Sequence, residues 1–392
     1  MGNRYSKVLK VYNLGSEGID LVNSPIHAKP GALTNAQNAT IRPVQGNTGI
    51  TKRDGMAKIN STVAAGSLAQ IINIPINSIG DNATCNVTSP DLEWTAGAWS
   101  HDLGLFAVVG TSGTGNRVIT SPDGVTWTSR TSAADITWED ITWHDEVDLF
   151  VAVGRGGTAA TQVMTSPDGI TWTSRTAAAD RDWQGICYSP DLNLFVAVAS
   201  SGAAAGMVMT SPDGINWTSR TASSVRGWLK VCWADTLTLF VAVGATSGQT
   251  NDVMTSPDGI TWTTRDPGIA ANYYDVAWSN ELGILVAVGE ADPSAVPKII
   301  SSTDGTTWTE TSTSLASDNR CRSIAWSSIF DVFVAANYAN DGMYVSSNGT
   351  TWQNVNTNCA ETLIEDVVWA STIEKFLLIG QDSGGVNVME VF

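Results

Sequence analysis

The sequence predicts an all-β fold: a circular β-propeller of seven four-stranded blades, the last blade closed by an N-terminal strand and preceded by an extended N-terminal arm. Three observations lead to this prediction. The phrase Ser-Pro-Asp-Gly-x-Thr-Trp recurs with a period of about 45 residues. Each period holds four short β-rich runs separated by turn signals, with no helical period between them. The 16 tryptophans recur at three fixed places in the repeat.

The recurring phrase is predicted to be a hairpin turn before the outermost strand of each blade. Proline sets φ near −65°, glycine supplies positive φ, and the Ser and Asp side chains accept hydrogen bonds from turn amides. The Trp that ends the phrase is expected to fill the wedge between adjacent blades. The structural residues of these turns are Asp54, Asp123, Asp168, Asp213, Asp258, Asp304, Trp127, Trp172, Trp217, Trp262, Trp308 and Trp352.

The strand count sets the predicted number of blades. After residue 94, seven first, second and third strands can be counted but only six fourth strands. Residues 51–65 align without a gap with 165–179, which places Lys58 at the position of Trp172. We therefore expect 51–65 to close the seventh blade, because an unclosed ring leaves a strand edge exposed. The predicted organisation is an extended docking arm at 1–50 and a propeller at 51–392, in which 66–93 is an insertion and 94–392 are the repeats.

Charge and composition exclude several classes of function. The chain has 392 residues and a formal charge of −17, which argues against a surface that grips nucleic acid phosphates. Residues 1–60 are basic, with eight Lys and Arg against three Asp and Glu, so the arm is expected to dock on something acidic. No segment predicts a membrane span or a signal peptide. The five cysteines lack metal-ligand spacing, and we expect no metal and no cofactor.

The turn phrase resembles the Asp-box, or bacterial neuraminidase repeat, of sialidase-like propellers, with one residue fewer between Asp and Gly. The resemblance covers residues 94–392. It implies that these turns lie on the face opposite the binding face, which would be built from the fourth-to-first and second-to-third strand loops. The residues of this candidate ligand face are Arg155, Arg181, Arg226, Tyr273, Tyr274 and Arg320.

A sialidase needs three arginines around one carboxylate, a Tyr nucleophile with a Glu partner, and an acid/base Asp. Arg181, Arg226 and Arg320 could supply the three arginines. However, the family's Phe/Tyr-Arg-Ile-Pro signature is absent, and neither Tyr273 nor Tyr274 has a clear Glu partner in the sequence. The sequence therefore predicts no catalytic residue and a protein that is not an enzyme.

The arm gives the main indication of function. Its segments 18–25, 30–33, 38–40 and 49–55, the last containing Lys52-Arg53-Asp54-Gly55, resemble the N-terminal segment of phage head-to-tail and short-tail nozzle proteins. This resemblance implies a non-enzymatic virion structural protein of a tailed phage, a propeller block in the tail, at the nozzle or hub or otherwise tail-attached.

On this hypothesis, residues 1–50 dock the block on a tail adaptor, portal-proximal proteins or neighbouring copies. We expect a homo-oligomer made in the host cytoplasm without a signal peptide, with DNA at most as passing cargo in a channel. The alternative is a receptor- or glycan-binding propeller, and the third hypothesis is a sialidase-like glycoside hydrolase.

Overall fold

The computed structural model describes residues 40–44, 47–51, 93–245, 252–291, 296–311, 320–337, 342–356, 362–382 and 387–391. The chain divides into two compact units, Met1–Ser78 and Ile79–Phe392. No helix in these described ranges is long and apolar enough to cross a membrane.

The described part of the first unit is a β-hairpin. Strands β1 (Thr40–Val44) and β2 (Asn47–Thr51) pair antiparallel, with Thr40 opposite Thr51. The prediction of an extended arm did not include this hairpin. Residues 1–39 of the arm and residues 52–92, which include Asp54 and the insertion, lie outside the described residues.

The second unit is built of antiparallel four-strand meanders, in which consecutive strands are neighbours. The first three are β3 (Trp94–Ser100), β4 (Leu105–Gly110), β5 (Val118–Ser121) and β6 (Thr128–Arg130); β7 (Thr137–His144), β8 (Leu149–Arg155), β9 (Val163–Ser166) and β10 (Thr173–Arg175); and β11 (Trp183–Ser189), β12 (Leu194–Ala199), β13 (Ala205–Ser211) and β14 (Thr218–Thr221). Two 3-10 turns, η2 (Ala159–Thr161) and η3 (Asp235–Leu237), lie in loops.

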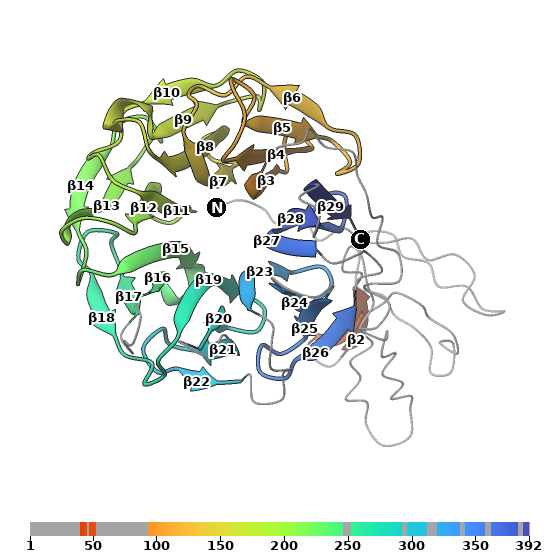
Figure 1. Ribbon diagram of the computed structural model, residues 1–392. Helices are drawn as coiled ribbons and strands as arrows, with labels where there is room; N and C mark the ends of the chain where they lie inside the picture. Colours follow the sequence, from red (N-terminus) through yellow and green to blue (C-terminus); the bar gives the residue numbers. More distant parts are fainter. Residues whose placement is uncertain are drawn as a thin grey trace. The chain divides into compact units, whose positions relative to one another are not determined.

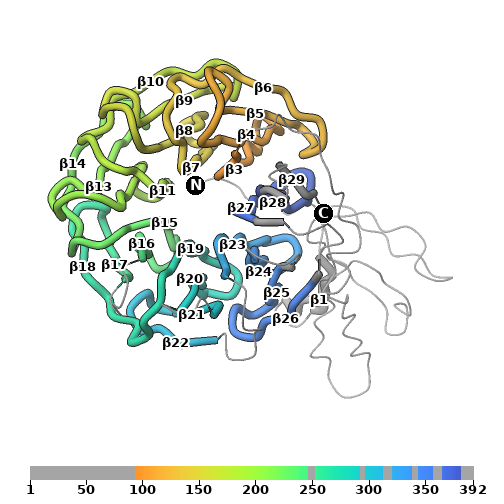
Figure 2. The backbone as a smooth tube through the Cα atoms, viewed as in Figure 1, coloured from red at the N-terminus to blue at the C-terminus, as the bar shows by residue number. Residues whose placement is uncertain are grey.

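The next three meanders repeat the pattern: β15 (Gly227–Ala234), β16 (Leu239–Ala245), β17 (Val253–Ser256) and β18 (Thr263–Arg265); β19 (Asn272–Ser279), β20 (Ile284–Glu290), β21 (Pro297–Ser302) and β22 (Thr309–Glu310); and β23 (Cys321–Ser327), β24 (Val332–Asn337), β25 (Gly342–Ser346) and β26 (Gln353–Asn356). A last sheet has β27 (Thr362–Ala370), β28 (Lys375–Asp382) and β29 (Asn387–Val391). Figures 1 and 2 show these sheets arranged radially, with the first strand of each innermost.

The fold is therefore a β-propeller with six four-stranded blades, and the prediction of seven four-stranded blades is wrong. The sheet β27–β28–β29 has three strands among the described residues. Of the segment 51–65, which was expected to add the fourth strand, only Thr51 is described, and it pairs with Thr40 in the hairpin. The six outer strands counted after residue 94 are confirmed as β6, β10, β14, β18, β22 and β26.

Apolar packing joins the last sheet to the first blade. Strand β27 contacts β3 as well as β23, so the inner strands form a complete circuit. Val368 and Ile379 of the last sheet belong to one buried cluster with Trp94 and Phe106 of the first blade. Large side chains between neighbouring sheets are the main source of stability in such a ring, because each sheet alone could bury only one face.

The Asp-Gly turns have the geometry that their sequence predicts. In the turn at 166–172, the backbone N–H groups of Ile170 and Thr171 each donate to Asp168 Oδ1 at 2.8 Å, and Ser166 Oγ donates to the same oxygen at 3.0 Å. Gly169 has a φ of 70°, which a residue with a Cβ adopts only with strain. The other described turns repeat this arrangement around Asp123, Asp213, Asp258, Asp304 and Asn348.

The turn tryptophans lie between blades, as predicted. Trp172 is buried in a cluster with Ala98 of the first blade and Phe150 of the second. Trp262, Trp308 and Trp352 are buried in the same way, and Trp127 and Trp217 are half-buried. The Trp172 indole N–H donates to Gly169 O at 3.1 Å, so this side chain both fills the wedge and fixes its own turn. The indoles of Trp127, Trp217 and Trp262 make the same bond.

Candidate functional site

A β-bulge near the start of every inner strand builds the candidate site. In each sheet the pairing register shifts one residue after the strand's first buried residue. A bulge adds one residue to a strand and turns its side chain away from the ladder. The seven bulged residues are Thr95, Glu139, Gln184, Leu229, Tyr274, Arg322 and Glu365, and with Lys230 they line one cavity of about 130 Å³, here called the central cavity.

Glycine on the second strand makes room for most of these bulges. Gly154 on β8 pairs with Trp138 on β7, directly before the bulge at Glu139. A Cβ at Gly154 would lie far inside van der Waals contact of the Thr137 carbonyl oxygen. Gly110, Gly244 and Gly289 occupy corresponding places and would meet the same obstacle. The Val-Gly ending of the second strand is therefore a local signal for the bulge.

Charged pairs hold the rim of the central cavity. Arg155 Nε donates to the Glu139 carboxylate, and this bond is the main cause of a raised pKa of Arg155. On the other side, the Tyr274 hydroxyl donates to Glu290, whose second carboxylate oxygen lies 2.8 Å from Arg320 Nε. Burial, followed by the contact with Glu290, raises the Tyr274 pKa to about 12.

A contact between an arginine and an aromatic ring also fixes the rim near Tyr274. The Arg322 guanidinium carbon lies 4.4 Å from the centre of the Tyr274 ring, within the range of a cation–π interaction. Burial raises the pKa of the neighbouring Glu365 carboxyl, while Arg322 acts in the opposite sense. Among the described residues, the Glu365 carboxylate and the Gln184 amide make no hydrogen bond, so both present polar atoms to the cavity.

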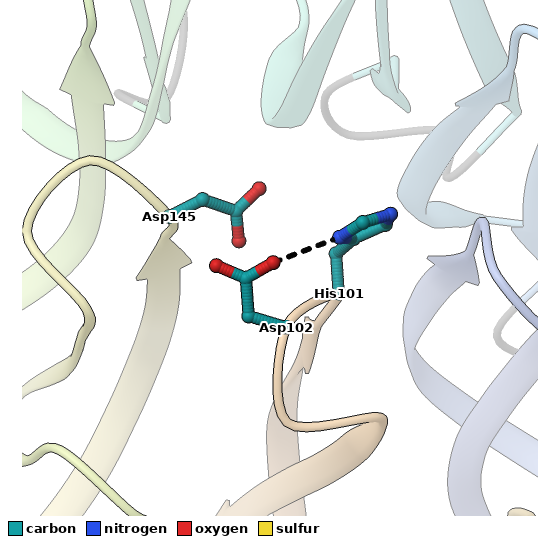
Figure 3. A group of neighbouring side chains, drawn as sticks. All are labelled: His101, Asp102 and Asp145. Carbon is teal, nitrogen blue, oxygen red and sulfur yellow. Dashed lines mark hydrogen bonds and ion pairs between the residues drawn. The ribbon is translucent and has the colours of Figure 1, made fainter.

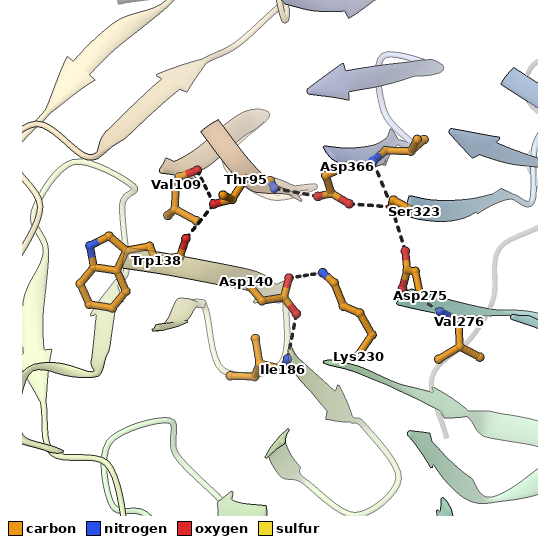
Figure 4. Close-up of polar contacts among 12 residues, drawn as sticks. Thr95, Val109, Trp138, Asp140, Ile186, Lys230, Asp275, Val276, Ser323 and Asp366 are labelled. Carbon is orange, nitrogen blue, oxygen red and sulfur yellow. Dashed lines mark hydrogen bonds and ion pairs between the residues drawn. The ribbon is translucent and has the colours of Figure 1, made fainter. Parts of the chain in front are cut away.

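Lys230 forms the floor of the cavity together with buried carboxylates (Figure 4). Its Nζ lies 2.6 Å from Asp140 Oδ1, and Asp140 Oδ2 accepts a hydrogen bond of 2.8 Å from the Ile186 N–H. Burial lowers the Lys230 pKa, but Asp140, Asp366 and Asp275 outweigh it and hold the pKa above its ordinary value. Burial raises the Asp140 pKa despite its contact with Lys230. One ammonium group thus interacts electrostatically with three acidic side chains.

A serine joins the other two carboxylates of this floor. Ser323 Oγ lies 2.8 Å from Asp275 Oδ2 and 2.7 Å from Asp366 Oδ1. A hydroxyl has one proton to donate, so the second short O···O contact becomes a hydrogen bond only when one of the carboxyl groups carries a proton. Burial raises the Asp275 pKa to about 6, so such a shared proton is expected below about pH 6.

The structure separates the predicted ligand-face residues into two groups. Tyr274 lines the central cavity, and Arg155 and Arg320 contact it through Glu139 and Glu290. By contrast, Arg181, Arg226 and Tyr273 do not line it. Arg226 Nε lies 3.4 Å from the buried Asp252, and Arg181 donates to the Asp180 carbonyl. Tyr273 is fully buried in the core.

These positions correct two readings of the sequence. The arginines 181, 226 and 320, which could have supplied the three arginines of a sialidase, do not line the cavity. Tyr274 does have a glutamate partner, Glu290, which lies at the end of the paired strand β20. We did not predict the cavity residues Glu139, Gln184, Lys230, Arg322 and Glu365 from the sequence. The available signal was the residue directly after the buried residue near the start of each first strand, because this position is Trp or Tyr in five of the seven sheets and the residue after it varies.

A separate group of ligand-type side chains lies at the other end of the first two inner strands (Figure 3). His101, Asp102 and Asp145 place their nitrogen and oxygen atoms within 4.8 Å of one another, and all three are exposed. His101 Nδ1 lies 3.1 Å from Asp102 Oδ1. Exposed acidic groups are common without a metal, and we assign this group no function.

Comparison with known proteins establishes the class of fold. No family model and no curated protein matches the chain. Among solved structures, it is similar to a streptogramin B lyase, with 10% identity over 80% of this chain and 99% of that chain and a TM-score of 0.63. A virginiamycin B lyase from Staphylococcus aureus gives 12% identity over 79% and 98%, with a TM-score of 0.63. YCF48 bound to D1 peptide gives 14% identity over 79% and 94%, with a TM-score of 0.58.

At such identities the comparisons show the fold alone, which is the β-propeller. They also correct the prediction that the protein is not an enzyme. That prediction rested on the absence of a recognised catalytic motif from the sequence. The same fold is found in lyases that are 10–12% identical to this chain. A propeller architecture is therefore compatible with catalysis, and the missing motif does not exclude it.

Proposed function

We propose that the protein is a virion structural protein of a tailed phage, a propeller block of the tail that is docked through residues 1–50. The observation that carries the proposal is the resemblance of segments 18–25 and 49–55 to the N-terminal segment of nozzle-type proteins. The partners proposed are a tail adaptor, portal-proximal proteins or neighbouring copies, and the assembly is a homo-oligomer.

The surface of the propeller supports an assembly role. Seven of the eight large apolar side chains that are exposed in the described residues lie on the face of the Asp-Gly turns and first-to-second strand turns: Leu103, Val125, Ile170, Leu192, Ile215, Ile260 and Leu282. The first-to-second strand turns also carry nine acidic residues and no Lys or Arg: Asp102, Asp145, Glu146, Asp148, Asp191, Asp235, Glu281, Asp331 and Glu374. A face that carries most of the exposed apolar side chains together with acidic turns offers a partner both apolar and charged contacts, which supports docking through this face.

Deletion of residues 1–45 tests the proposal. The expected result is a protein that keeps the circular dichroism spectrum of the propeller but no longer enters particles, as measured by immunoblot of purified virions. The full chain carrying Glu365→Gln in the central cavity is the matched control, and it should enter particles normally. Normal incorporation of the deleted chain would refute the arm's role.

The central cavity favours a second candidate, a receptor- or glycan-binding propeller. A polar cavity at the centre of a propeller, lined by one residue from each inner strand, is the kind of concave site in which ligands bind. A glycan array tests this candidate directly. Binding that is lost in Tyr274→Phe or Glu365→Gln would support it, and an array without hits would count against it.

The contact between Tyr274 and Glu290 favours testing the third candidate, a sialidase-like hydrolase. A tyrosine with a glutamate partner is the nucleophile arrangement of such enzymes. A fluorogenic sialoside should then be cleaved by the wild type and not by Tyr274→Phe. Arg181→Ala, which lies outside the cavity, is the matched control. Equal fluorescence from wild type, Tyr274→Phe and a blank would eliminate this candidate.

A further inference from the structure

We propose that the central cavity binds a guanidinium group, either the side chain of an arginine in a protein partner or a small free guanidine. This proposal goes beyond the virion role and does not depend on it. It is based on the size of the cavity, the polar atoms presented to it and the balance of charge around it.

The size of the cavity fits a guanidinium with a short stem. Its volume is about 130 Å³. A cavity of ~150 Å³ accommodates benzene, a molecule of about six non-hydrogen atoms. The part of an arginine side chain beyond Cβ has a similar number of non-hydrogen atoms, and its guanidinium end is planar.

Three of the side chains that line the cavity present acceptor atoms to it. The Glu365 carboxylate and the carbonyl of Gln184 accept no hydrogen bond within the described part of the chain. Glu139 uses one carboxylate oxygen for Arg155, which leaves its other oxygen. A guanidinium has five N–H donors in one plane when it ends an arginine side chain, so it can satisfy several acceptors on different blades at once.

The charge around the cavity also favours a cation. The lining residues and the ionisable groups that act on them electrostatically comprise four cationic and seven acidic side chains: Lys230, Arg322, Arg155 and Arg320 against Glu139, Glu365, Asp140, Asp275, Asp366, Glu290 and Glu93. Lys230 is already held by Asp140 at 2.6 Å. A ligand cation would reduce the remaining excess of negative charge in a partly buried site, where charge pairs are weakly screened.

The geometry of Arg322 and Tyr274 shows that the site already accommodates a planar cation. The Arg322 guanidinium lies over the Tyr274 ring at 4.4 Å, and the ring is oriented by Glu290. A second guanidinium can stack on the first or contact Glu365 and Glu139 edge-on. Guanidinium groups are weakly hydrated and tolerate such stacking, whereas an ammonium group would lose more hydration.

Isothermal titration calorimetry of the full chain with three probes tests the proposal. The probes are blocked arginine (N-acetyl-arginine amide), its uncharged isostere N-acetyl-citrulline amide, and methylguanidine. Blocked arginine should bind saturably with one site per chain, and the citrulline probe should not. Glu365→Gln should weaken binding of blocked arginine at least about tenfold, because it removes one partner of a partly buried charge pair.

Asp191→Asn is the matched control, because it changes the net charge by the same amount. Asp191 is exposed and follows the far end of β11, and its substitution should leave the affinity unchanged. Circular dichroism melting of both variants checks that they fold.

Methylguanidine binding as tightly as blocked arginine would indicate a free guanidine, and weaker binding would indicate an arginine of a partner; both support the guanidinium assignment. The proposal is overturned if blocked arginine does not saturate the protein, if the citrulline probe binds equally well, or if the two variants behave alike.

Discussion

Replacing Lys230 with methionine tests the central structural claim, that one buried ammonium group stabilises the carboxylates at the floor of the cavity. Methionine fills most of the volume of the lysine stem but carries no charge. The Lys230 Nζ lies 2.6 Å from Asp140 Oδ1, and the two side chains are 20% and 7% exposed. Removing one partner of a buried pair costs about 3–5 kcal/mol, because the other charge is left uncompensated. We therefore expect the free energy of unfolding to fall by about 3–5 kcal/mol at pH 8.

The loss should depend on pH in a defined direction. The folded-state pKa of Asp275 is about 6 against an ordinary value of 3.8, so the folded protein binds this proton more tightly than the unfolded chain. This group's contribution to the free energy of unfolding therefore falls as pH rises from about 4 to about 6. Without Lys230, the pKa values of Asp275 and Asp140 should rise further. The destabilisation should consequently be smaller at pH 5 than at pH 8.

Urea unfolding followed by tryptophan fluorescence at pH 5 and pH 8 measures both effects. Lys298→Met is the matched control: Lys298 Nζ lies 2.5 Å from Glu310 Oε1, a carboxylate that is 28% exposed, and a pair of this kind is worth at most about 1 kcal/mol. Adding Asp140→Asn to Lys230→Met should recover part of the loss. A loss below about 1 kcal/mol, or an equal loss at both pH values, would show that the reasoning is wrong.

Three further substitutions test the turn, the bulge and the shared proton. Asp168→Ala removes the acceptor of two turn amides and should lower the free energy of unfolding in urea by about 1–2 kcal/mol. Asp168→Asn should be nearly neutral, because Asn348 makes the same bonds with its Oδ1 in the last turn. Gly154→Ala places a Cβ against the Thr137 carbonyl and should cost about 1–3 kcal/mol, measured as a lower thermal midpoint. Ser323→Ala removes the hydroxyl between two carboxyl groups and should lower the free energy of unfolding by about 1–3 kcal/mol at pH 8 and by less at pH 5. An equal loss at both pH values would contradict a shared proton.

The repeat made most of the propeller predictable from sequence. The Asp-Gly turns needed only local information, because Asp168 bonds to amides two and three residues away and Gly169 adopts a positive φ within the same turn. The wedge position of Trp172 followed from its fixed place in the period. The number of four-stranded blades did not follow, because it depended on where one non-repeated segment pairs, and pairing between distant segments is not encoded in a local pattern.

The candidate site was less predictable than the fold. The arginines predicted for the ligand face lie in loops or at a strand end, whereas the cavity is lined by bulged residues near the start of the inner strands. Tyr274 was identified, but its partner Glu290 is sixteen residues away and meets it only through the pairing of β19 with β20. The usable local signal was a variable residue that follows a recurring buried Trp or Tyr near the start of the first strand.

The sequence by itself determined the all-β repeat, the turn chemistry and the burial of the tryptophans, because these depend on contacts within one repeat or between adjacent copies. Only the tertiary structure decided the count of six four-stranded blades, the packing of the last sheet on the first blade, and the central cavity. The cavity requires one side chain from every sheet to meet at a common centre, and Lys230 and Asp140, which are 90 residues apart, become partners only when the ring is formed.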